Sequence, residues 1–195
     1  MRRGIVVGIL LLLLTFVFCA NSYAENLYQM MGISLRGGAG FPSAGGQDVG
    51  PGIQGAVSYG FNKYLNGEFE VGWQMSKWKN YGDIHTFPIL FNLQLRAADL
   101  SENFVPYIVG GVGPAIVTMS EKSAYSSDLS WGVALKGGLG FDYYITPNWV
   151  LNAEGSYYFT SCKANVNYKG GGEVTKHDNQ SFWFVGAGLK YYFEL

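Results

Sequence analysis

The chain has 195 residues and is close to neutral, with 13 Lys and Arg against 14 Asp and Glu and a net charge of −1. This balance excludes the strongly basic surface of a nucleic-acid-binding protein and gives no reason to expect a strongly acidic partner. Glycine (28 residues) and aromatic side chains (16%) are abundant, charged residues make up only 14%, and the length fits one domain.

The N-terminus has the three parts of a secretory signal. Met1-Arg2-Arg3 is positive, the run from Ile5 to Phe18 is almost entirely apolar, and Ser22-Tyr23-Ala24 places small residues at the two positions that a signal peptidase reads. We therefore predict a cleaved signal peptide over residues 1–24 and an outer-membrane domain over residues 25–195.

Two other interpretations of this N-terminus remain open. The first is an N-terminal membrane helix, against which the short apolar run and the cleavage site argue. The second is a lipoprotein signal acylated at Cys19, against which the bulky Phe18 argues. After cleavage Cys162 is the one remaining cysteine, so an internal disulfide is excluded, and the thiol either pairs between chains or is an incidental small residue.

Apolar and polar side chains alternate in several segments after the signal. Between Trp131 and Phe159 two such segments, each of ten or more residues, flank a turn, with aromatic residues at the ends of the apolar face. A strand that crosses a bilayer needs about 9–11 residues, whereas ordinary strands have about five or six, so this pattern indicates a membrane β-hairpin. The predicted strands cover residues 31–41, 53–61, 65–74, 87–96, 104–119, 131–143, 149–160 and 183–194. The register of Phe104–Met119 is ambiguous because both of its faces are apolar.

Strands in hydrocarbon satisfy all their backbone hydrogen bonds only by closing on themselves. We therefore predict an all-β fold, an eight-stranded antiparallel up-and-down transmembrane β-barrel in the outer membrane of a Gram-negative cell. Short connections (Asn62-Lys63, Ala97–Asn103, Thr146–Asn148) alternate with long ones (Pro42–Val49, Ser76–Ile84, Ser120–Asp128, Ser161–Gln180). The short turns and both chain termini are expected to face the periplasm.

Pro88 and Pro114 fall inside predicted strands. A closed barrel has no edge on which a missing N–H donor is harmless, so we expect bulges at these residues, or strands that end closer to the periplasm.

The inward faces differ between the two halves of the barrel. The half nearer the periplasm carries opposite charges in near balance, which are expected to pair in a lumen just wide enough for side chains. This lumenal charge network is predicted to comprise Arg36, Glu68, Glu70, Arg96, Lys136, Asp142, Glu154, Lys190 and Glu194. The outer half is predicted to form a lumenal apolar pocket of Ala56, Leu90, Ala134, Tyr158, Phe182 and Phe184. An apolar vestibule over a charged plug is one interpretation; in the other, Tyr158 and Phe184 only fill the top of the barrel.

Several segments resemble the outer-membrane protein W family of small Gram-negative barrels. They are Pro106-Tyr107 opening a Gly-rich strand, Ser130-Trp131-Gly132 followed by Leu135-Lys136-Gly137-Gly138, Thr146-Pro147-Asn148-Trp149, and the order His85, Pro88, Leu93. The resemblance covers residues 83–195 and implies an eight-stranded barrel with an apolar lumenal pocket that passes small hydrophobic molecules toward a lateral opening. The chain departs from the family pattern by ending on Leu195, two residues beyond the aromatic Phe193.

These features favour a narrow channel or pocket for small hydrophobic or amphipathic solutes. The alternative is a structural or adhesive surface barrel whose loops, chiefly Ser161–Gln180, form the contact surface. An enzyme is not expected, because the two histidines, His85 near Asp83 and His177 before Asp178, match no spacing of nucleophile and base. We expect no metal and no cofactor, and we expect outer-membrane lipid and a small hydrophobic solute as partners.

Overall fold

The computed structural model describes residues 29–78, 82–101, 103–120, 125–127, 129–164, 166–168 and 178–194. The signal peptide predicted over residues 1–24 lies outside these residues and stays a prediction, as does the domain boundary at residue 25. No helix in the described part of the chain is long and apolar enough to cross a membrane.

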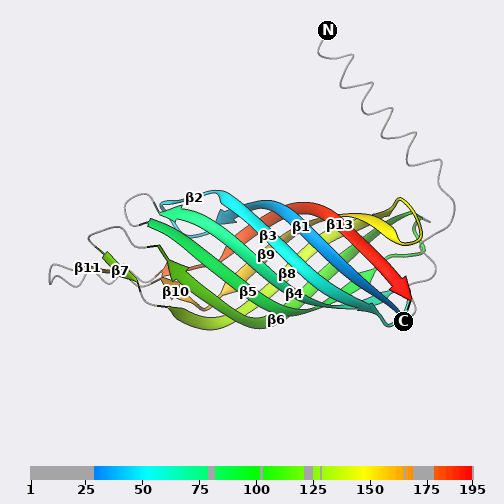
Figure 1. The fold of residues 1–195 in the computed structure, drawn as a ribbon, viewed down its shortest axis with the longest axis horizontal. Coiled ribbons are helices and arrows are strands. Elements are labelled where there is room, and N and C mark those ends of the chain that lie inside the picture. Colours follow the sequence, from blue (N-terminus) through cyan, green and yellow to red (C-terminus); the bar gives the residue numbers. More distant parts are fainter. Residues whose placement is uncertain are drawn as a thin grey trace, which may run out of the picture.

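Eight long strands form an antiparallel sheet that closes into a barrel (Figure 1). They are β1 (Met30–Pro42), β3 (Gly50–Gly60), β4 (Leu65–Trp78), β5 (Gly82–Arg96), β6 (Phe104–Met119), β8 (Ser130–Tyr144), β9 (Trp149–Thr160) and β13 (Phe182–Glu194). Each pairs with the next along the chain, and β1 pairs with β13 to close the ring. The predicted fold class is confirmed.

Five short strands lie outside this ring of eight. They are β2 (Gln47–Asp48), β7 (Tyr125–Ser127), β10 (Lys163–Ala164), β11 (Val166–Tyr168) and β12 (Asp178–Asn179). All of them belong to the connections at one end of the barrel, whereas the C-terminal end of β13 lies at the opposite end, beside the short turns (Figure 1).

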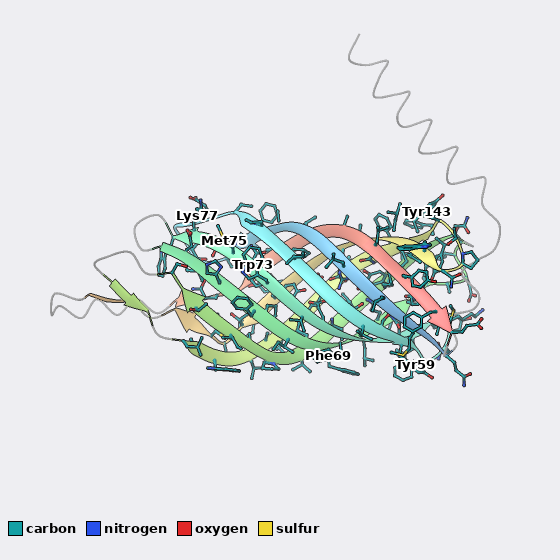
Figure 2. All side chains as sticks on the ribbon, in the orientation of Figure 1. Tyr59, Phe69, Trp73, Met75, Lys77 and Tyr143 are labelled. Carbon is teal, nitrogen blue, oxygen red and sulfur yellow. The ribbon has the colours of Figure 1, made fainter. Side chains whose placement is uncertain are left out.

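Burial alternates along the strands because one face meets lipid and the other the narrow lumen. On β9, Val150 is fully buried while its neighbour Leu151 is 45% exposed. The outside carries large apolar side chains, among them Phe69 on β4, which Figure 2 shows projecting from the barrel wall. A soluble protein does not leave so many large apolar side chains exposed, whereas a bilayer requires them.

Hydrophobicity alone does not decide which face of strand β6 points into the lumen. Val105, Tyr107 and Val109 are buried in the lumen, and Ile108 and Val112 are exposed on the outside. Because both sets are apolar, the composition of β6 does not decide which face points inward. Its pairing with β5 and β8 does.

The two prolines produce gaps in the ladder and not bulges, so the prediction of bulges or lower strand ends is wrong. Between β4 and β5 the register runs to Val71–Ile89 and resumes unchanged at Gln74–Thr86, omitting the pairs that would involve Pro88 and Phe87. Between β5 and β6 it omits the pairs opposite Pro114 and Gly113 and again resumes unchanged. Each gap contains a proline, which has no N–H to donate.

The prediction of a long loop over Ser76–Ile84 is also wrong. Strand β4 runs to Trp78, which pairs with Gly82 at the start of β5. Because Trp78 and Ile84 are buried at the outer end of the lumen, the alternation continues past the point where the sequence becomes polar.

Candidate functional site in the lumen

A buried arginine from β1 is the centre of the lumenal charge network. One terminal nitrogen of Arg36 lies 2.8 Å from Glu68 and 2.9 Å from Glu70, and the other lies 2.6 Å from Glu154. The two glutamates of β4 point inward because they are two residues apart in the strand, and Glu154 occupies the equivalent inward face of β9.

Lys136 of β8 supplies the second cation of this group. Its Nζ lies 2.6 Å from Glu70 and 2.6 Å from Glu154. Three carboxylates therefore share two cations, and neighbouring amides supply further donors, such as Gln94 Nε2 to Glu68 at 3.0 Å. Charged hydrogen bonds of this kind are what makes burial of so many ions tolerable.

A second group of charges surrounds Asp142. Arg96 lies 3.5 Å and Lys190 3.4 Å from its carboxylate. Asn152 joins the two groups, because its Nδ2 donates to Asp142 at 2.6 Å and its Oδ1 accepts from Arg36 at 3.4 Å. The described lumen thus holds four buried cations and four buried anions in one connected network.

Glu194 does not belong to this network, although its position in the alternation predicted that it would. It is the last residue of β13, opposite Met30, and it is exposed. The alternation gives the face of a residue but not its height, and Glu194 lies beyond the lumen.

The periplasmic end of the lumen is closed by aromatic and aliphatic side chains that the sequence analysis did not single out. The rings of Tyr144 and Tyr192 stack at 6.5 Å between centroids. They form one buried cluster with Ala98, Val105 and Val150. Tyr144 also accepts a 2.5 Å hydrogen bond from Arg96, so this floor is tied to the charges above it.

The outer half of the lumen holds a second apolar cluster. Five of the six residues predicted for the apolar pocket lie in it, and each is at most 4% exposed. The cluster comprises Trp78, Ile84, Leu90, Ala115, Val117, Ala134, Tyr158, Cys162, Phe182 and Phe184. Tyr158 and Phe182 stack at 4.7 Å with nearly parallel rings. These side chains pack against one another, so an apolar layer lies in the outer half of the lumen.

Ala56, the sixth predicted residue, lies apart from this cluster. It is buried and pairs with Glu70 from β3, as Leu90 does from β5, but its short side chain is not part of the apolar cluster. A small apolar side chain does not indicate where along the barrel axis the residue lies.

A hydrogen-bonded chain that the sequence analysis missed joins the apolar layer to the charges. Gln54 donates to the Tyr158 hydroxyl at 2.7 Å, and Tyr158 donates to Glu70 at 2.7 Å. Tyr107 similarly donates to Glu154 at 3.1 Å. The inward position of these residues in the alternation was the available signal, but the pattern does not say which residue each one meets.

His85 lies on the outer surface and not in the lumen. Its Nδ1 lies 3.2 Å from Trp73 Nε1 and its Nε2 lies 3.2 Å from Ser120 Oγ. His177 lies outside the described residues. Within the described ranges, no three or more His, Cys, Asp or Glu side chains are grouped as a metal site would require.

A closed antiparallel barrel with apolar side chains outside and paired charges inside is the architecture of the small outer-membrane β-barrels. The family described as the outer membrane protein β-barrel domain matches residues 10–169, and the chain belongs to that family.

The chain is similar to outer membrane protein W of Vibrio cholerae, with 27% identity over 134 residues that cover 62% of this chain and 59% of the Vibrio protein. The chain therefore matches only about three-fifths of that relative's length. The predicted resemblance to the outer-membrane protein W family is confirmed, and the protein is an outer-membrane protein.

Two solved structures share the fold at lower identity. Neisserial surface protein A has a TM-score of 0.60 and 18% identity, covering 84% of this chain and 97% of its own. Ail, the attachment invasion locus protein of Yersinia pestis, has a TM-score of 0.56 and 17% identity, covering 85% of this chain and 99% of its own.

Proposed function

We propose that this barrel takes small hydrophobic or amphipathic solutes into the outer, apolar half of its lumen and passes them sideways into the membrane through the wall at β5. The role has no enzymatic step. This role is more specific than that of a small outer-membrane barrel, and it rests on the different chemistry of the two halves of the lumen.

The charge network argues against a straight path along the barrel axis. Arg36 and the three glutamates that contact it have fully buried side chains, and a solute on the axis would separate them. Breaking one buried ion pair typically costs about 3–5 kcal/mol, because the remaining charge loses its partner without regaining water. A solute that enters the apolar layer therefore leaves more easily through the wall.

The interrupted ladder beside the apolar layer is the observation that carries the proposal. Phe87 and Pro88 lack pairs with β4, and Ile89 and Leu90 lack pairs with β6. Leu90 belongs to the packed apolar layer. The stretch of wall in which the pairing of the strands is interrupted therefore borders the apolar half of the lumen.

Uptake of a radiolabelled medium-chain alkane by Gram-negative cells that produce the barrel tests this function. Replacing both Pro88 and Pro114 by valine restores two backbone donors, and we expect uptake to fall several-fold. Pro106→Val is the matched control, since Pro106 lies in an unbroken part of the ladder opposite Phe141. Uptake no greater than that of cells without the barrel, or unchanged in the double variant, would contradict the proposal.

A surface-contact role is the second candidate, and the paired loops favour it. β11 pairs with β7, so two loops that are distant in sequence form a small sheet beyond the barrel (Figure 1). The shared fold with the attachment invasion locus protein agrees with such a role. Deleting residues 163–179 should abolish adhesion of cells to a host surface and leave alkane uptake intact; the reverse result would exclude this candidate.

A further inference from the structure

Beside the interrupted part of β5, three side chains from three strands or their ends meet on the outside of the barrel. Trp73 projects from β4, His85 from β5, and Ser120 follows β6 directly. Figure 2 shows Trp73, Met75 and Lys77 following one another along β4 toward the loop end of the barrel. Trp73 lies in the gap itself, because its expected partner Phe87 is one of the unpaired residues.

The hydrogen bonds fix the tautomer of His85. The indole N–H of Trp73 can only donate, so the 3.2 Å contact requires an unprotonated Nδ1 on His85. The ring hydrogen is then on Nε2, which donates to Ser120 Oγ at 3.2 Å. The planes of the two rings are nearly parallel, at 17°, and their centroids are 6.0 Å apart.

We propose that Trp73, His85 and Ser120 form a clasp that holds the gap between β4 and β5 closed, and that protonation of His85 releases its β4 side. The clasp rests on the proposed lateral exit and gives that exit a control by pH. Trp73 and His85 are positioning residues, because they act on the wall and not on the solute.

Protonation of the His85 imidazole breaks only one of its two hydrogen bonds. Histidine is the side chain that ordinarily gains a proton between pH 8 and pH 5. A proton on Nδ1 removes the acceptor and points an N–H at the indole N–H, so the bond to Trp73 is lost. The bond from Nε2 to Ser120 is unaffected, so His85 stays tied to the end of β6 while its side-chain bond across the gap to Trp73 is lost. The backbone pairing of His85 with Met75 remains.

Among the described residues, few groups surround His85. Asp83 lies two residues before it on the same face of β5, and Lys77 pairs with Asp83 from β4. Directly opposite His85 are Met75 on β4 and Thr118 on β6, neither of which is charged. Asp83 and Lys77 have opposite charges.

Amide hydrogen exchange in lipid nanodiscs at pH 7.5 and 5.5 tests the clasp. Protection factors, which divide out the intrinsic pH dependence of exchange, are followed for residues 71–76 and 84–90. In the parent protein we expect protection to fall about fivefold at pH 5.5, the loss expected for one hydrogen bond. Equal protection at the two pH values would overturn the proposal.

Three variants make the test specific. Trp73→Phe keeps the aromatic ring without the donor and should show low protection at both pH values. His85→Asn offers an acceptor that does not titrate and should show high protection at both. Trp131→Phe, on the exposed face of β8, should behave as the parent does. If Trp73→Phe matches the parent at both pH values, the clasp does not exist.

Alkane uptake by the same variants separates the clasp from the proposed function. Uptake that rises as protection falls supports both. If protection changes as expected while the parent shows no uptake, the proposed function fails and the clasp stands. If the parent shows uptake that is the same in Trp73→Phe and His85→Asn, the clasp is not part of the exit and the proposal is overturned.

Discussion

Arg36 joins three carboxylates from two strands, and no other side chain of the described lumen has as many ion-pair partners. Replacing it by methionine, which has a similar length, leaves Glu70 and Glu154 with Lys136 alone and removes the ion pair of Glu68. We expect a loss of about 3–5 kcal/mol in the free energy of unfolding, because buried carboxylates would lack a counter-charge.

Urea unfolding in lipid vesicles, followed by tryptophan fluorescence, measures this change. Glu194→Gln is the control: the side chain is exposed, and its replacement should alter the free energy of unfolding by no more than about 0.5 kcal/mol. Similar values for the two variants would show that the network does not hold the lumen together.

Asp99 provides a pH-dependent prediction outside the membrane, on the turn between β5 and β6. Lys63 donates to its carboxylate at 2.7 Å and the Tyr64 hydroxyl does so at 2.7 Å. These bonds favour the charged form and hold the pKa of Asp99 below its usual range. Because its pKa is lower in the folded protein, Asp99 stabilises the barrel at pH values above the pKa that it has in the unfolded chain. This stabilisation is lost as the pH falls through the pKa of Asp99 in the folded protein.

A carboxyl ¹³C NMR titration measures the pKa of Asp99 directly. Lys63→Met removes one donor, and we expect the pKa to rise toward the ordinary value of about 3.9. A pKa that is the same in parent and variant would mean that the link between the two turns does not form in solution.

At the scale of single residues the sequence predicts faces better than partners. The alternation of apolar and polar side chains predicted that Arg36 and Glu154 face inward, and both do. That these two meet at 2.6 Å depends on how far the strands are staggered around the barrel, which no local pattern contains. The same limit explains the error at Glu194, whose face was right and whose height was not.

Strand β1 offers a test of the alternation within one element. Gly37 faces lipid, and a Cβ added there would meet nothing within 4 Å. A Cβ on the adjacent Gly38 would clash with the Val185 carbonyl oxygen and would lie 2.8 Å from the Phe184 ring. We therefore expect Gly38→Val to destabilise the barrel by at least about 1–3 kcal/mol, the usual cost of overpacking.

The matched variant is Gly37→Val, one residue away on the same strand. It adds an apolar side chain on the lipid side, so it should be neutral or stabilising in the same urea experiment. Equal destabilisation by the two substitutions would mean that the faces of β1 are misassigned.

At the scale of elements, the existence of all eight strands was predictable but some of their limits and irregularities were not. β6 has apolar side chains on both faces, so its register came only from its neighbours. Pro88 and Pro114 were expected to force bulges or lower strand ends, yet two missing pairs on each side of β5 accommodate them with the register intact.

For the whole molecule, the filled lumen predicts the absence of a steady ionic current. The charge network and the tyrosine floor close the axis, and within the described residues both clusters are buried. In a planar bilayer the purified barrel should show no steady conductance at neutral pH. A stable open level would require an axial path that this packing does not contain.

Methyl NMR in nanodiscs containing a lipid-borne spin label tests most directly the claim that alternate side chains meet acyl chains while their neighbours meet a closed lumen. We expect strong broadening of the methyl signals of Leu139 and Leu151, which are exposed on the outside. The signals of Val150 and Leu90, which are fully buried, should remain sharp. Equal broadening of Leu151 and its neighbour Val150 would contradict the arrangement on which the rest depends.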